Sequence, residues 1–209
     1  MAGMPVKAVY ATSEWIAGHG EVLKKLAASA VYTVEEQALK QMSALTTPNK
    51  AMALLDMPAP NPQLPGKGSL VLALEAIQDP GNMGTIIRIA DWFGIREIVC
   101  SPDCVDVYNP KTIQATMGSI ARVRISEADM QSFLESTELP SYAATLHGQD
   151  ITGFSRLTEG IILIGNEGRG LSEAVTAAAT HQITIPRLGG AESLNAAVAT
   201  GIICGRLLI

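Results

Sequence analysis

Apolar and polar positions alternate along the chain in a way that separates short strands from amphipathic helices. In residues 1–56 the pattern predicts strands over 6–11, 30–33 and 51–55, and helices over 13–26 and 34–45. The second helix follows Thr33, with Glu36 three residues later, a spacing typical of a capping box. These residues therefore predict a small α/β unit. Its core would be thin if it stood alone, because so short a chain buries little surface.

Residues 69–209 alternate in the same way but are more apolar. The runs 70–74 and 161–164 are nearly continuous in apolar residues, which is typical of strands covered on both faces. Further strands are predicted over 97–100, around Val123, and over 142–145 and 182–185, with helices over 83–93, 112–117, 128–134, 172–179 and 194–208. This alternation predicts an α/β domain with a mostly parallel sheet.

The segment 57–68 separates the two regions and contains four prolines and two glycines. Proline lacks a backbone donor and disfavours helix at the residue before it, so this segment is predicted to be a linker. The chain is thus expected to comprise a small domain over 1–56, a linker over 57–68 and a larger domain over 69–209.

The composition is that of a soluble globular protein, with 47% hydrophobic and 17% charged residues. The net charge of −5 gives no indication of nucleic-acid binding, which usually needs a basic patch on the surface. A negative total charge does not exclude such a patch. The N-terminus has no apolar signal region, and no run reaches the roughly 18 apolar residues that span a bilayer. We therefore expect a cytoplasmic protein without a membrane partner.

The cysteines and histidines give no sign of a metal site or a catalytic triad. Cys100, Cys104 and Cys204 form no disulfide framework, and the odd count suits a reducing compartment. Cys100 and Cys104 are four residues apart without a nearby second pair of ligands, so buried small residues are favoured over zinc. Among the isolated histidines, only His147 follows a predicted strand where it could line a pocket, although a structural role is favoured.

Candidate chemistry is concentrated in three Gly-rich turns that place polar side chains in irregular backbone. The first runs over 79–88 and carries Asn82 and Arg88. Glycine lets a ligand approach the backbone closely, and arginine offers a fork of donors suited to phosphate. For Arg88 alone, a surface position on an amphipathic helix is an equally good interpretation.

The second turn, 164–171, follows an apolar strand and precedes a helix. Its glycines are spaced G-x-x-G-x-G, unlike the G-x-G-x-x-G of dinucleotide-binding folds, and Glu167 would repel a pyrophosphate. A neutral or cationic ligand with hydroxyls and an adenine ring fits better, and a simple tight turn is the alternative. The third turn, 185–195, brings Ser193 and Asn195 to a helix start, where an ordinary N-cap is the favoured interpretation of this turn taken alone.

Taken in order, these turns resemble the three signature motifs of the SpoU (TrmH-type) RNA 2′-O-ribose methyltransferases of the SPOUT superfamily. The motifs read Asn82-x-Gly-x-x-x-Arg88 after Asp79-Pro80-Gly81, then Ile162-Leu-Ile-Gly-Asn-Glu-Gly-Arg-Gly-Leu-Ser172, then Ile185-Pro186 followed by Ser193-Leu-Asn195. The match covers about residues 69–209. Residues 1–56 resemble, less strongly, the small ribosomal-protein-like substrate-binding domain often found ahead of it.

The resemblance implies a deep trefoil knot in the C-terminal segment, a homodimer, and RNA as the partner. It implies S-adenosyl-L-methionine as methyl donor, S-adenosylhomocysteine as product, and no metal. By motif position, the cofactor-binding residues are Thr145, Leu146, His147, Gly148, Ile164, Gly165, Asn166, Gly168, Ile185, Pro186, Leu188, Ser193 and Leu194. The catalytic set would be Arg88, which engages RNA phosphate and helps deprotonate the 2′-hydroxyl, with Asn82, Glu167, Ser193 and Asn195 positioning the ribose and the arginine.

Two positions depart from the family pattern. Leu188 stands where the family often has Met. In addition, an opening strand and helix of the usual substrate domain have no counterpart before Val6, so either translation starts elsewhere or the domain is truncated. We expect methyl transfer to ribosomal RNA in preference to transfer RNA. The alternatives are a non-catalytic RNA-binding protein with the same knot and a nucleotide-dependent oxidoreductase of ordinary Rossmann type.

Overall fold

The computed structural model describes residues 4–43, 45, 47–58 and 65–209. The chain divides into two compact units, Met1–Ala59 and Pro60–Ile209, which are described separately. Half of the predicted linker, residues 59–64, lies outside the described residues. The substrate-binding role expected of residues 1–56 and the methyltransferase role expected of residues 69–209 stay predictions.

The first unit is a three-stranded sheet with short helices. Its strands are β1 (Val6–Ala11), β2 (Val31–Thr33) and β3 (Ala51–Leu55), in the order β2-β1-β3, with β2 parallel and β3 antiparallel to β1. Its helices are α1 (Ser13–Gly18), α2 (Gly20–Leu23), the 3₁₀ turn η1 (Ala28–Ala30) and α3 (Glu36–Met42). The predicted helix over 13–26 is interrupted at His19, between Gly18 and Gly20, because glycine is a poor helix former.

The predicted capping box at Thr33 is wrong. Thr33 pairs with Ala11 as the last residue of β2, and the Val34 amide donates to the Ala11 carbonyl. This ladder keeps the backbone extended past Thr33, so α3 begins only at Glu36 and its N-cap is Glu35, which makes no side-chain cap.

The second unit is built on a six-stranded sheet in the order β6-β5-β4-β8-β7-β9, and all of its pairings are parallel. The mostly parallel sheet predicted from the sequence is therefore confirmed. The strands are β4 (Leu70–Leu74), β5 (Glu97–Cys100), β6 (Arg124–Glu127), β7 (Ser141–Asp150), β8 (Gly160–Ile164) and β9 (His181–Thr184).

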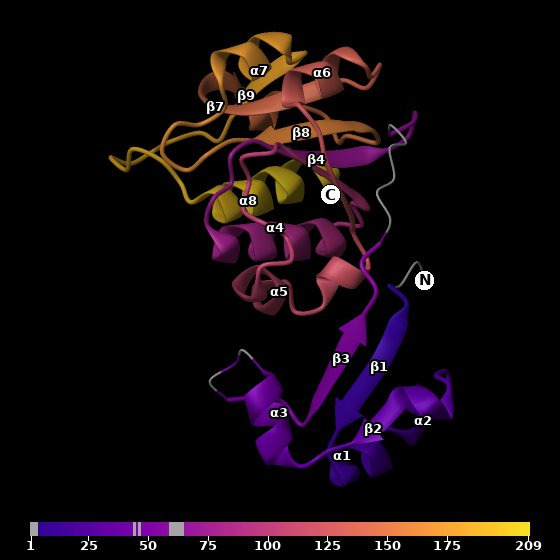
Figure 1. Ribbon diagram of the computed structural model, residues 1–209. Coiled ribbons are helices and arrows are strands. Elements are labelled where there is room, and N and C mark those ends of the chain that lie inside the picture. Colours follow the sequence, from indigo (N-terminus) through magenta and orange to yellow (C-terminus); the bar gives the residue numbers. More distant parts are fainter. Residues whose placement is uncertain (1–3, 44, 46, 59–64) are drawn as a thin grey trace. The chain divides into compact units, whose positions relative to one another are not determined.

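Helices cover both faces of this sheet (Figure 1). On one face lie α4 (Pro80–Trp92) and α8 (Ala196–Leu208), with α5 (Pro110–Thr116) packed against α4; on the other lie α6 (Met130–Glu135) and α7 (Glu173–Ala178). Short 3₁₀ turns occur at η2 (Ser119–Ala121) and η3 (Ile151–Gly153). Covered on both sides, β4 and β8 are buried along nearly their whole length, as their continuous apolar runs predict.

Two element boundaries differ from the predictions in ways that matter for function. Helix α4 begins at Pro80, three residues earlier than predicted, because the Asp79 carboxylate accepts from the Asn82 amide at 2.7 Å and caps the helix. Strand β7 continues to Asp150 instead of ending near residue 145, since its pairing with β9 resumes at Gln149 after an irregular segment. No helix among the described residues is long and apolar enough to cross a membrane.

Candidate functional site

The loop that follows β8 is held closed by close backbone contacts. A Cβ on Gly165 would lie 2.3 Å from the Gly170 carbonyl carbon and the Leu171 nitrogen, so only glycine fits here. Asn166 and Gly170 exchange backbone hydrogen bonds of 3.1 and 2.8 Å across the loop. The Asn166 side chain accepts from the Gly168 and Arg169 amides and donates to the Ala76 carbonyl at 2.9 Å.

Strand β7 bulges at the residues between its two pairing segments. Ala144 and Gln149 both pair with Ile183 of β9, so the intervening residues 145–148 leave the ladder. Gly148 closes this bulge, because a Cβ there would come within 2.5 Å of the Gln182 and Ile183 backbone. The predicted cofactor loop is therefore an excursion within one strand.

The third segment connects β9 to α8 and ends in a helix cap. The Asn195 Oδ1 accepts from the Ala197 and Val198 amides at 3.0 and 3.2 Å, which confirms the N-cap interpretation. Its Nδ2 donates to the Asn82 side chain at 2.8 Å, so the same residue also reaches across to α4.

These three segments together enclose a cavity of about 720 Å³. This volume lies in the range of small-molecule sites, roughly 300–1,000 Å³. Of the residues predicted to bind a cofactor, all but Gly148 line the cavity: Thr145, Leu146, His147, Ile164, Gly165, Asn166, Gly168, Ile185, Pro186, Leu188, Ser193 and Leu194. Gly148 instead packs behind them against β9.

A chain of side-chain hydrogen bonds joins the three motifs. The Asn82 Nδ2 donates to the Glu167 carboxylate at 2.6 Å, and the Asn82 Oδ1 accepts from Asn195. Both ends of the Asn82 amide are therefore used, which fixes its orientation. The structure thus brings together three of the five residues predicted to be catalytic, and a fourth, Ser193, lines the cavity with Glu167.

Arg88 stands apart from this group. It lies on the exposed side of α4, is not among the residues lining the cavity, and makes no hydrogen bond or ion pair with any described residue. The Arg88 guanidinium is therefore available to bind a group that does not belong to this chain.

The walls of the cavity suit a ligand with both apolar and polar parts. Leu146, Ile164, Ile185 and Leu194 supply apolar surface, while the irregular loops leave backbone groups outside the sheet ladders. The Thr145 hydroxyl is buried and has no hydrogen-bond partner in the described structure. Because an unpaired buried hydroxyl is costly, it indicates a place for a ligand polar group.

The cysteines do not assemble a metal site. Among the described residues, no group of three or more His, Cys, Asp or Glu side chains is placed to hold a metal ion. Cys100 and Cys204 are buried as predicted, and burial raises the pKa of Cys204 to about 12. Cys104 is only half-buried, and a hydrogen bond with Cys100 lowers its pKa to about 7.

Comparison with known proteins assigns the fold and the motifs to one family. Residues 69–205 match the SpoU rRNA Methylase family. The chain is 33% identical over 205 residues to an uncharacterized tRNA/rRNA methyltransferase of Synechocystis, covering 91% of this chain and 72% of that one. It is 30% identical over 178 residues to the 23S rRNA (guanosine(2553)-2′-O)-methyltransferase RlmP of Bacillus subtilis, covering 82% and 70% of the two chains.

The fold agrees with these matches. The crystal structure of an AdoMet-bound rRNA methyltransferase from Sinorhizobium meliloti superposes with a TM-score of 0.85 at 27% identity, covering 99% of this chain and 80% of that one. The matched residues contain all three Gly-rich turns. The chain therefore belongs to the SpoU rRNA methylase family.

Proposed function

We propose that this protein transfers the methyl group of S-adenosyl-L-methionine to a ribose 2′-hydroxyl of RNA. The observation that carries the proposal is the joining of three separate motifs into one site, with a cavity on one side and the Asn195–Asn82–Glu167 hydrogen bonds on the other. The AdoMet-bound relative and the 2′-O-methyltransferase from Bacillus support the cofactor and the reaction class.

The cavity residues would hold the cofactor. The apolar side chains at its wall suit an adenine ring, and the backbone groups of 145–148, 164–168 and 185–194 suit hydrogen bonds to the adenine and ribose. Glu167 makes the site unfavourable for a pyrophosphate but compatible with a cationic sulfonium. When bound, the cofactor supplies a methyl group already activated for transfer, so the protein has no need of a metal.

Methyl transfer then requires that the target ribose is aligned with the methyl group and that its 2′-hydroxyl loses a proton. Both tasks would be performed by the residues around Asn82. Asn82, Glu167, Ser193 and Asn195 would orient the target ribose, because their side chains are held by the Asn82-centred hydrogen bonds or line the same cavity. Arg88 would bind the RNA phosphate and favour deprotonation of the 2′-hydroxyl through its positive charge. Only RNA offers this hydroxyl, which explains the class of substrate.

We further propose that the C-terminal segment forms a trefoil knot. In the sheet, β8 lies between β4 and β7, and β9 then adds beyond β7, before α8 returns to pack on α4. Such threading is rare in proteins, and here it would bring the loop after β8 and the segment after β9 to one cavity.

A homodimer is proposed through the outer face of α4 and α8. Trp92, the last residue of α4, and Val198 and Ile202, one turn apart on α8, are exposed, Trp92 by 83%. Exposed apolar clusters on a globular unit commonly mark an interface. Arg88 precedes Trp92 by one helical turn, so the face that would pair two copies also carries the proposed catalytic arginine.

For the RNA itself, we propose ribosomal RNA in preference to transfer RNA, with the unit before the linker contributing to its binding. The relative from Bacillus, by its name, methylates 23S rRNA. Mapping ribose methylations in cells with and without this gene tests the preference for ribosomal RNA. A lost site in rRNA is expected. A lost site only in tRNA would overturn the preference, and no lost site together with intact cofactor binding would favour a non-catalytic RNA-binding protein.

A further inference from the structure

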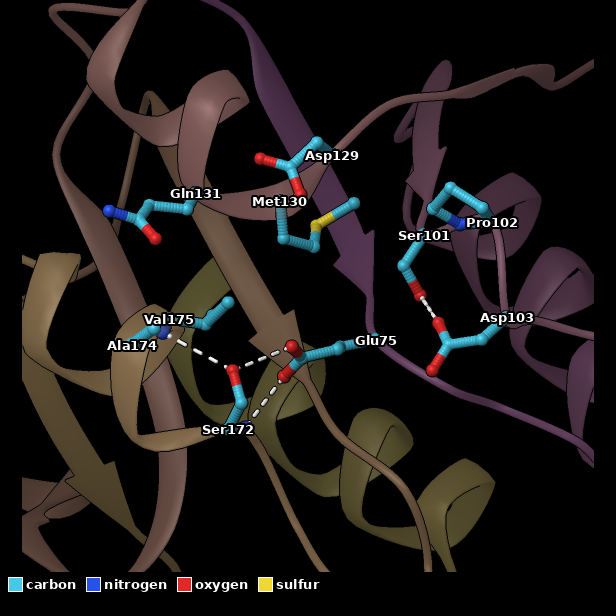
Figure 2. Close-up of a pocket in the computed structure, with 10 residues that line it drawn as sticks. All are labelled: Glu75, Ser101, Pro102, Asp103, Asp129, Met130, Gln131, Ser172, Ala174 and Val175. Carbon is cyan, nitrogen blue, oxygen red and sulfur yellow. Dashed lines mark hydrogen bonds between the residues drawn. The ribbon is translucent and has the colours of Figure 1, made fainter.

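Glu75 lies immediately after β4, outside the three motifs, and its carboxylate contacts the end of the second motif. The backbone amide and the hydroxyl of Ser172 each donate to one of its oxygens, both at 2.7 Å (Figure 2). Hydrogen bonds to a carboxylate are roughly twice as strong as neutral ones. Ser172 in turn caps α7 by accepting from the Val175 amide, so its hydroxyl is oriented by both partners.

Glu75 does not face the proposed cofactor. It lines a second, separate cavity of about 260 Å³ together with Ser101, Asp103, Asp129 and Ser172, and it is absent from the lining of the large cavity. The Glu75 carboxylate therefore binds groups of the protein itself, and a substitution of Glu75 can change methyl transfer only by moving those groups.

The residue after Glu75 is held just as firmly. Ala76 has φ of 55°, a left-handed conformation that a non-glycine L-residue rarely adopts because it strains the backbone. The Ser101 hydroxyl accepts from the Ala76 amide at 2.9 Å, and Asn166 of the second motif donates to its carbonyl at 2.9 Å. These bonds maintain the strained backbone.

The segment from Glu75 to Asp79 thus connects the second motif to α4. Within this segment, Ala76 is hydrogen-bonded to Asn166 near the start of the 164–172 loop, and Glu75 is hydrogen-bonded to Ser172 at the end of that loop. The segment ends at Asp79, which caps α4. A third connection, the hydrogen bond from Asn82 to Glu167, joins the middle of the loop to the first turn of the helix. The cofactor loop and the RNA-side helix are therefore connected at three points.

We propose that Glu75 is a positioning residue that holds the 164–172 loop and α4 at a fixed distance and orientation from each other. The inference rests on the proposed function, since that is where alignment of cofactor and RNA matters. Misplacement of reacting groups by about 1 Å can lower a rate by roughly 100-fold. Loss of this carboxylate would therefore lower kcat more than it lowers binding of either substrate.

The test compares Glu75→Gln with a matched control, Glu159→Gln. Glutamine can still accept from the Ser172 amide and donate to its hydroxyl, but it removes the negative charge that makes both bonds strong. Glu159 makes a bond of the same kind, accepting from the Gly68 amide at 2.7 Å, but it lies at the amino ends of β4 and β8, away from the motifs. Both variants remove one negative charge, which weakens two bonds at Glu75 and one at Glu159, so the control accounts for the loss of charge itself.

At saturating RNA and cofactor, kcat of Glu75→Gln should fall by about 10- to 100-fold, with KM for RNA little changed. Glu159→Gln should keep kcat within about twofold of the wild type, the ordinary effect of a distant surface change. Adding Ser172→Ala to Glu75→Gln should lower kcat little further, because both changes weaken the contact between residue 75 and the Ser172 hydroxyl. A wild-type kcat in Glu75→Gln, or an equal loss in Glu159→Gln, would overturn the inference.

Amide hydrogen exchange tests the coupling without any turnover. In Glu75→Gln, the amides of 165–171 and 76–82 should both exchange faster, and in Glu159→Gln neither should change. Unchanged exchange in Glu75→Gln would overturn the inference. If the wild-type protein transferred no methyl group, the proposed function would fail while the exchange result still decided the role of Glu75.

Discussion

Gly165→Ala is the substitution whose effect can be worked out most directly from the structure. The added Cβ would lie 2.3 Å from two backbone atoms and 2.5 Å from the Gly170 oxygen. Backbone atoms cannot rotate away, so the loop must open and give up the two hydrogen bonds between Asn166 and Gly170. At about 1 kcal/mol for each bond, closing the loop around a ligand would cost about 2 kcal/mol. This corresponds to an increase of about 30-fold in the Kd for S-adenosyl-L-methionine.

Isothermal titration of the purified protein with S-adenosyl-L-methionine measures this change. Gly153→Ala is the matched control, because the nearest atom to its added methyl would be 3.9 Å away and the residue lies in η3. Its Kd should stay within about twofold of the wild type, a difference under about 0.5 kcal/mol. If Gly165→Ala bound the cofactor as tightly as the control, the loop after β8 would not form the cofactor site.

Three further changes have defined outcomes. Arg88→Ala should abolish methyl transfer and leave the Kd for S-adenosyl-L-methionine nearly unchanged, since Arg88 does not line the cavity; comparable turnover would remove its assigned role. Trp92→Glu should convert a dimer into a monomer in light scattering while the fold remains, because its side chain is 83% exposed; an unchanged mass would argue against this interface. Hydrogen bonds from Arg122 lower the pKa of Asp91, so their stabilisation is present above about pH 4 and lost as pH falls through the lowered pKa. Asp91→Asn should therefore cost about 1 kcal/mol of unfolding free energy at pH 7 and much less at pH 2, and an equal cost at both values would contradict this origin.

The arrangement of strands and helices followed from the sequence where burial is complete. The runs at β4 and β8 are apolar at every position, because helices cover both faces, and this pattern indicated parallel strands. In the first unit, short sequence patterns predicted the helix boundaries less well. There the ladder between Thr33 and Ala11 outweighed a capping-box spacing, and no local pattern contains that contact.

The candidate site was predictable as a set of residues but not as a set of contacts. Glycines and polar side chains in irregular backbone marked the three turns; the second and third line one cavity, and the first joins them through the hydrogen bonds of Asn82. The bulge in β7 could not be predicted, because it depends on two residues of one strand pairing with Ile183. Glu75 was missed for a similar reason: its partner Ser172 is 97 residues away.

The most direct test of the proposed function is the position of a transferred methyl group. Purified protein, tritiated S-adenosyl-L-methionine and unmodified ribosomal RNA are incubated together, and the RNA is then hydrolysed with alkali. A 2′-O-methyl ribose blocks cleavage of the adjacent phosphodiester, so the label should appear in alkali-resistant dinucleotides. Label in mononucleotides would place the methyl on a base, and it would contradict ribose methylation.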